Sequence, residues 1–157
     1  ELKRTFRLLG QLTEKGIQPD GITFLSVLTI CGHAGLVLKG QGYFQDMGNE
    51  YGIVPDLTHY NSLLDLMARA GQLDEAIVIM DKMPCEPNVV TWSILLGACQ
   101  RWGNVTVGSL AFNQAMQLDA TSSPSYILMS NIYAASGMQE EAESIEAMRR
   151  KMMAGRN

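Results

Sequence analysis

The chain has 157 residues, of which 46% are hydrophobic and 18% charged, so it can bury a core and is too weakly charged for a disordered tail. Its net charge of −4 argues against a protein that holds nucleic acid by bulk electrostatics, because that mode requires clustered Lys and Arg. No apolar run approaches the length of about eighteen residues that a membrane span requires, so we expect no membrane association.

One pattern occurs four times along the chain. An aromatic residue stands eleven residues before a glycine, and five residues after that glycine comes a residue with little or no side chain. The copies are Phe24, Gly35 and Gly40; Tyr60, Gly71 and Ala76; Trp92, Gly103 and Gly108; and Tyr126, Gly137 and Ala142. Successive aromatic residues are 36, 32 and 34 residues apart. A fixed internal phase with a slightly variable period is typical of stacked repeats.

Helical spacing predicts the elements of each copy. Residues 2–15 predict the second helix of a truncated repeat. The first helix of each of the next three copies carries apolar residues at i, i+3, i+4 and i+7 and should end at its glycine, which can adopt the left-handed conformation. A second helix follows, clearest over residues 73–83, and its Gly or Ala should let the paired helices approach closely. The fourth copy is looser, because Ser130 interrupts the stripe of Tyr126, Met129 and Tyr133.

Turns containing proline separate the copies, at residues 16–20, 52–56 and 83–88. Proline cannot continue a helix and restrains the residue before it. The chain then consists of one half repeat and four helix–turn–helix units, which must stack because a single hairpin cannot bury its apolar faces. We predict an all-α fold, an α-solenoid of about nine helices.

The GIxPD turn, the xTF or xHY opening, the helix closed by AG and the repeat of about 35 residues together resemble the pentatricopeptide repeat family, whose solenoid is right-handed. After the second helix of a truncated repeat (1–20), residues 21–56 resemble the long-type repeat of the plant PLS subclass and 57–88 the short-type repeat. Residues 89–122 and 123–157 resemble the first and second E motifs. The tetratricopeptide repeat has a similar period, but its Trp–Leu-Gly–Tyr first helix and closing proline are not seen here.

The resemblance implies which residues face RNA. In this family each repeat offers one base to two side chains, the fifth residue of the first helix and the last residue of the repeat. Carried over by position, the pairs are Leu25 with Asp56, Asn61 with Asn88 and Ser93 with Ser122, while Ile127 has no clear partner and Asp20 closes the truncated repeat. Family members place a side chain that packs against the base at the positions of Ile22, Thr58 and Val90.

Asn61 with Asn88 is the pair best suited to reading a base. An Asn amide supplies both a donor and an acceptor, and in the family's code this pair favours a pyrimidine. The alternative is that Asn61 caps or solvates the start of a helix, as Asn often does. Leu25 can pack on a base but cannot form a hydrogen bond with it, so its repeat should read weakly. Ser93 and Ile127 give no convincing code.

We expect no catalytic site, no metal and no cofactor. A DYW-type cytidine deaminase needs an HxE segment and a CxxC pair to hold zinc, whereas Ala-Gly follows His33 and Tyr-Asn follows His59. The histidines are interpreted as helix-surface or inter-repeat residues. The three cysteines are widely spaced, which fits a reduced compartment, and Cys31 and Cys99 share a core phase.

The resemblance implies a module of an organellar C-to-U RNA-editing factor that binds single-stranded RNA in a sequence-specific way. Its partners would be that RNA, a DYW-type deaminase in cis or in trans, and multiple organellar RNA editing factor (MORF) proteins. The organelle would be the mitochondrion or the chloroplast, with the mitochondrion favoured. Two alternatives stay open: a protein-interaction scaffold in an organellar ribosome or polymerase, and a factor for RNA splicing or stability. The acidic charge and the poor code of most copies favour the scaffold.

The last expected helix carries acidic residues early and basic residues late, from Glu140 to Lys151. This order suits the helix dipole. An equally weighted interpretation is a charged surface on which a following domain docks.

Overall fold

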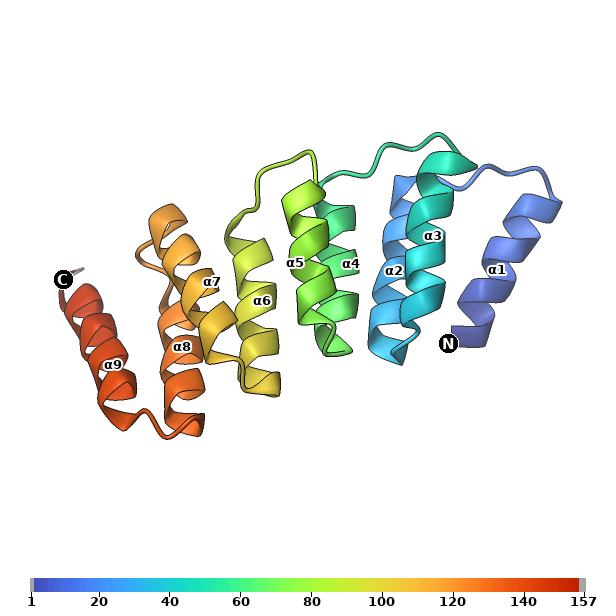
Figure 1. The fold of residues 1–157 in the computed structure, drawn as a ribbon. Helices are drawn as coiled ribbons and strands as arrows, with labels where there is room; N and C mark the ends of the chain where they lie inside the picture. The colour runs from blue at the N-terminus through green and yellow to red at the C-terminus, as the bar shows by residue number, and fades with distance from the viewer. Residues whose placement is uncertain (1, 156–157) are drawn as a thin grey trace. The chain divides into compact units, whose positions relative to one another are not determined.

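The computed structural model describes residues 2–155, without the side chains of Leu2, Thr5, Leu8, Leu9, Leu12 and Thr13. The described residues form nine helices and no strand, as Figure 1 shows. Their bounds are α1 Leu2–Glu14, α2 Gly21–Ala34, α3 Val37–Asn49, α4 Leu57–Arg69, α5 Leu73–Lys82, α6 Val89–Trp102, α7 Val105–Leu118, α8 Ser123–Ala135 and α9 Gln139–Ala154. The predicted all-α class and helix number are confirmed for this part of the chain.

The helices form two compact units, Glu1–Glu86 and Pro87–Asn157. In the first unit the first helices α2 and α4 pack on each other, and α3 and α5 pack beside them (Figure 1). In the second unit α6 packs on α7 and α8, and α9 packs on α8. The division into long, short and two E-type repeats stays a prediction. None of the described helices combines the length and the apolar character needed to cross a bilayer.

The repeated glycines end the first helices, with one small correction. Gly35 and Gly103 are the C-caps of α2 and α6, with φ of 66° and 70°, in the left-handed region that a side chain disfavours. In α4 and α8 the helix ends one residue earlier. Their C-caps are Ala70 and Ser136, and the positive-φ glycine follows the cap.

The apolar stripes of the first helices form the core, and Cys31 and Cys99 are fully buried in it as expected. The fourth copy differs from its predicted stripe. Ile132 is buried beside Met129, whereas Tyr133 is half-buried and its hydroxyl lies 3.2 Å from the Ser109 hydroxyl.

Ser130, which interrupts that stripe in the sequence, has a structural role. Its hydroxyl donates a 3.1 Å hydrogen bond to the carbonyl of Ala142 in α9. A polar residue at an apolar phase therefore joins the two helices of its hairpin.

The small residues after the glycines allow close helix contact, as expected. A Cβ added to Gly40 would clash with Leu66 of the next first helix and would lie 3.2 Å from the Cβ of Cys31. A Cβ added to Gly108 would lie 3.0 Å from Ile132 and 3.4 Å from Cys99. The second helices α3 and α7 thus each lie tightly against two first helices, and this contact sets which face of those helices stays open.

Candidate nucleic-acid interface

The four residues carried over as fifth positions are the fifth residues of their helices. Leu25, Asn61, Ser93 and Ile127 hold this place in α2, α4, α6 and α8. Because each residue turns an α-helix by about 100°, the second, fifth, ninth and thirteenth residues share one face. We call this face of each first helix the reading stripe.

The second residues of the stripe are open to solvent. Ile22 is 74% exposed and Val90 is 55% exposed, and Thr58 is also exposed. The fifth residues Leu25, Asn61 and Ser93 are half-buried beside them, three residues further along each helix. An exposed apolar side chain next to a half-buried one can lie flat against a base, as the resemblance implies for this stripe.

The residues carried over as the last of each repeat are helix N-caps. Asp20, Asp56 and Asn88 cap α2, α4 and α6, each with extended backbone, and each accepts from the backbone N–H of the third helix residue. Ser122 is the N-cap of α8 but makes no side-chain cap bond. The alternative that Asn61 caps a helix is wrong, because Asp56 caps α4 and Asn61 lies a full turn inside it.

Hydrogen bonds lower the pKa of the two aspartate caps, which are ionised at neutral pH. The Thr23 hydroxyl and backbone N–H, 2.7 and 2.8 Å from Asp20 Oδ1, hold the pKa of Asp20 below its ordinary value. The backbone N–H of His59 is the main cause that lowers the pKa of Asp56. Both caps therefore present a negative charge beside the reading stripe.

Of the two histidines in the chain, His59 is buried, and it links two copies of the repeat. Its Nδ1 lies 2.7 Å from Asp56 Oδ1, and its Nε2 donates to the carbonyl of Gly21, 2.8 Å away, at the first position of α2. A side chain on Gly21 would meet the His59 ring at 3.4 Å. Of the two predicted roles, His59 has the inter-repeat one, and His33 is exposed on its helix.

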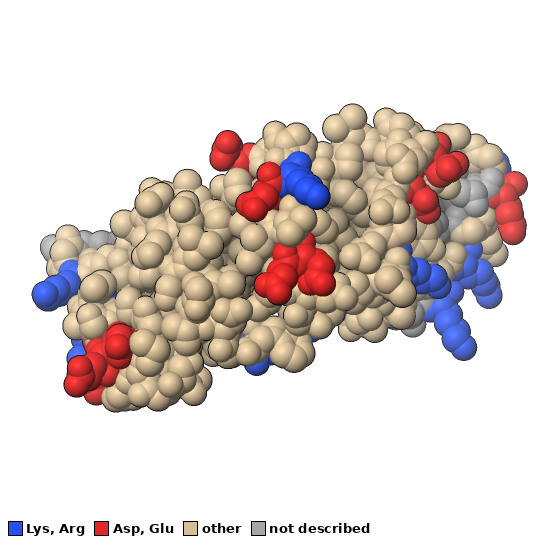
Figure 2. Space-filling model, viewed as in Figure 1, with Lys and Arg blue, Asp and Glu red and all other residues tan. Residues whose placement is uncertain are grey.

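A third group on the reading stripe was not predicted from the sequence. The thirteenth residues of α2, α4 and α6 are His33, Arg69 and Arg101, nine residues after each aromatic. Arg69 pairs with Asp65, the ninth residue of α4, at 2.7 Å. This regular phase was visible in the sequence but was overlooked, because charge was weighed only as a total. On the face seen in Figure 2, most Lys and Arg atoms gather over and beside α1, and wide uncharged areas cover much of the rest.

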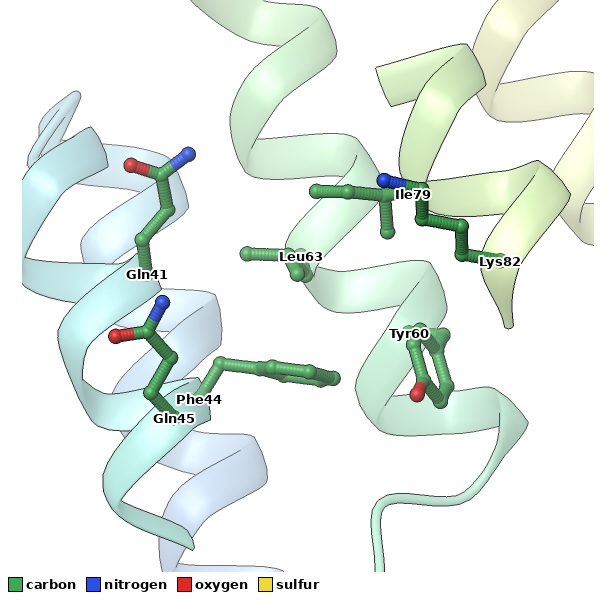
Figure 3. Close-up of a pocket in the computed structure, with 7 residues that line it drawn as sticks. All are labelled: Gln41, Phe44, Gln45, Tyr60, Leu63, Ile79 and Lys82. Atoms are coloured by element: carbon green, nitrogen blue, oxygen red, sulfur yellow. The ribbon is translucent and has the colours of Figure 1, made fainter. Parts of the chain in front are cut away.

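A pocket of about 390 Å³ lies on the other side of α4, between α3 and α5. Figure 3 shows Gln41 and Gln45 of α3 on one side and Lys82 of α5 on the other. The remaining lining residues are Phe44, Tyr60, Leu63 and Ile79. The Phe44 and Tyr60 rings meet edge to face, with centroids 5.0 Å apart. Tyr60 is therefore half-buried in this pocket instead of fully in the core, unlike the corresponding Phe24.

No three His, Cys, Asp or Glu side chains in the described part of the chain are placed to hold a metal ion. Burial raises the pKa of the Cys99 thiol to about 11 and also raises that of Cys31. What the geometry offers is a series of surface side chains at a regular phase, and the stacked hairpins define an α-solenoid repeat protein.

Known proteins with similar sequences show to which family of repeat proteins the chain belongs. A model described as the PPR repeat family matches residues 55–101, and the E motif model matches residues 102–155. A putative pentatricopeptide repeat-containing protein of Arabidopsis thaliana is 40% identical over 94% of this chain, and a second is 41% identical over 96%. A third, named as mitochondrial, is 42% identical over 92%. The chain belongs to the pentatricopeptide repeat family and carries its E motif.

Solved structures agree on the fold. The maize pentatricopeptide repeat protein PPR10 superposes with a TM-score of 0.73 at 27% identity, over 95% of this chain and 22% of that one. PPR10 in complex with an 18-nt psaJ RNA element gives 0.80 at 23% identity, over 91% and 22%, and that likeness supports the fold alone. The chain also spans only 20%, 24% and 23% of the three Arabidopsis relatives.

Proposed function

We propose that this chain is the part of an organellar C-to-U RNA-editing factor that holds single-stranded RNA and positions a deaminase. The single observation that carries the proposal is the phase of its polar residues. Asn61 lies on the reading stripe at the fifth position of α4, and Asn88 caps the next first helix, which are the two places where the family reads a base. The match to the E motif supports it, and so does the likeness to PPR10, which is 25% identical to this chain in a further complex with an 18-nt PSAJ RNA element.

RNA binding would depend on individual side chains at fixed positions more than on the net charge of the chain. The exposed second residues would pack against bases, Asn61 and Asn88 would form hydrogen bonds with one base, and Arg69 and Arg101 would contact phosphates two turns further along the stripe. With a net charge of −4, few counterions would be released, so the salt dependence of binding should be shallow. The long–short–E–E order of repeats is part of this proposal, and so is the pyrimidine preference of the short repeat.

The chemistry would be supplied by a DYW-type deaminase in cis or in trans. The chain itself would bind and position, and MORF proteins are candidate further partners. The mitochondrion is the favoured compartment because two of the Arabidopsis relatives carry that word in their names. The charged surface of α9, where Arg149 pairs with Glu146 at 2.6 Å, is the place where we expect the deaminase to dock.

The test uses the full-length factor. Replacing Asn61 by Ala should weaken binding of the target RNA roughly fivefold, because about one hydrogen bond is lost. Editing at the target cytidine should fall as well. Asn113→Ala is the matched control, because Asn113 is exposed on the second helix α7, off the reading stripe. Unchanged affinity and unchanged editing in Asn61→Ala would refute the assignment of Asn61.

A protein-interaction scaffold is the second candidate function. The pocket between α3, α4 and α5 favours it, since it lies off the reading stripe and is lined largely by apolar side chains. If the full-length factor binds no single-stranded RNA but still enters a ribosome- or polymerase-sized assembly, the scaffold is correct and the editing proposal is wrong.

A further inference from the structure

We propose that Thr91 is a specificity-determining residue that orients Asn88, so that the amide NH₂ of Asn88, and not its carbonyl, faces the RNA base. The inference rests on the proposed RNA-reading function. Thr91 is the third residue of α6 and is fully buried, whereas Asn88 is exposed. Thr91 would act through Asn88 without touching the RNA itself.

Three hydrogen bonds join the two residues. Asn88 Oδ1 accepts from the backbone N–H of Thr91 at 3.0 Å and from the Thr91 hydroxyl at 3.0 Å. The same hydroxyl accepts from the backbone N–H of Asn88 at 3.1 Å. A backbone N–H can only donate, so the atom facing it must be the amide oxygen. Nδ2 has no hydrogen-bond partner among the described residues and is the group that Asn88 can offer to a ligand.

The buried hydroxyl is what makes this orientation firm. With the backbone N–H alone, a single bond would hold the amide, and the side chain could leave it for another staggered rotamer. The hydroxyl adds a second bond to Oδ1 and fixes the backbone of Asn88 as well. Because Thr91 is fully buried, water cannot easily replace its hydroxyl if that is removed.

Asp20 and Thr23 form the same arrangement at α2 and provide a contrast within the chain. The Thr23 hydroxyl donates to Asp20 Oδ1 at 2.7 Å, as Thr91 does to Asn88. A carboxylate, however, has two equivalent oxygens and only accepts, so it has no donor to orient. The hydroxyl should therefore influence selectivity under Asn88 and only helix capping under Asp20.

A donor that points outward selects a base edge with acceptors. Both pyrimidines have an acceptor at O2 and differ at N3. N3 of cytosine also accepts a hydrogen bond, whereas N3 of uracil carries a hydrogen that would repel an amide donor placed against it. An Asn88 held by Thr91 should therefore favour cytosine over uracil at the nucleotide of its repeat. An Asn88 free to turn over could serve either base, and the preference would shrink.

The experiment measures RNA affinity of the full-length factor for two target RNAs that differ only by cytosine or uracil at that nucleotide. Thr91→Val should reduce the ratio of the two affinities about three- to fivefold, toward equality. Thr91→Ser should restore it, and Thr91→Cys, with its weak donor, should give an intermediate value. Thr23→Val, the matched control, should leave the ratio unchanged while it weakens capping.

Two results would overturn the inference. One is an unchanged ratio in Thr91→Val, or in Thr91→Cys if the valine variant does not fold. Another is an equal loss of selectivity in Thr23→Val. Asn88→Ala separates this inference from the proposed function: if it abolishes the base preference while the Thr91 variants keep it, only the role of Thr91 fails. If wild type and Asn88→Ala both lack a preference, the reading function of Asn88 fails as well.

Discussion

Adding one methyl group at two neighbouring glycines of α3 should have opposite effects on stability. Gly40 and Gly42 both lie inside this helix, so replacing either with Ala gains the same helix propensity, about 1 kcal/mol. Their surroundings differ. A Cβ on Gly40 would clash with Leu66 and lie 3.2 Å from Cys31, whereas a Cβ on Gly42 would meet nothing within 4 Å.

The magnitude follows from that difference. Leu66 and Cys31 are both fully buried, so neither can move aside without disturbing the core. Overpacking of this kind costs about 1–3 kcal/mol, which equals or exceeds the propensity gain. Gly40→Ala should therefore lower the free energy of unfolding by about 0–2 kcal/mol, and Gly42→Ala should raise it by about 0.5–1 kcal/mol. Since the propensity gain cancels between them, the two variants should differ by about 1–3 kcal/mol.

Urea unfolding followed by circular dichroism measures this difference. The midpoint should fall for Gly40→Ala and rise for Gly42→Ala, with a similar slope for both, since neither change alters the surface exposed on unfolding. If Gly40→Ala stabilises the protein as much as Gly42→Ala, the small residues are not needed for close helix contact. The structural explanation for the repeated Gly and Ala would then be wrong.

Three further predictions concern the buried histidine, the cysteines and the acid limb of stability. His59→Thr should keep the capping of α4 but lose the hydrogen bond to the carbonyl of Gly21. In a thermal melt, the free energy of unfolding should fall by about 1–2 kcal/mol. An unchanged melting temperature would refute the link between the two copies. Because burial raises the pKa of Cys99 to about 11, a thiol reagent at pH 8 should label half-buried Cys85 much faster, and equal rates would contradict this. Folding lowers the pKa of Asp56 from 3.8, so the ionised carboxylate stabilises the folded state above that pH, and this stabilisation is lost as the pH falls through the folded pKa. In Asp56→Asn, the free energy of unfolding should therefore change less with pH below about pH 4. An unchanged slope would contradict this prediction.

The sequence predicted helices and core because both depend on local periodicity. An aromatic residue, two apolar turns and a glycine define a first helix without any knowledge of its neighbours, and Phe24, Leu28 and Cys31 are buried as that pattern requires. The stop was predicted to within a residue, since only glycine adopts the left-handed turn easily. The positions of Leu25 and Asn61 on the stripe follow directly from where those helices begin.

Side-chain networks between copies could not be predicted in the same way. The bond from His59 to the carbonyl of Gly21 joins residues 38 positions apart, and no local pattern encodes it. Ser130 reads as a flaw in an apolar stripe until α9 is in place beside it. Arg69 is a different case, because its phase was present in the sequence and the total charge obscured it.

The capping geometry explains which residues can close a repeat. The closing residue must accept a hydrogen bond from the third residue of the next helix, so Asp, Asn and Ser suit the position, as Asp20, Asp56 and Asn88 show here. These are also short side chains that can offer a donor or an acceptor to a base. Replacing a closing residue by one that changes the base preference but cannot cap the helix should lower the free energy of unfolding by about 1 kcal/mol. Ser122 makes no cap bond, and Pro124, the second residue of α8, suits the first turn of a helix. Capping therefore no longer restricts that position. The proposed reading positions and the helix caps therefore coincide in the copies up to α6 and separate at α8. There we expect positioning of a partner to take over from the proposed recognition of RNA.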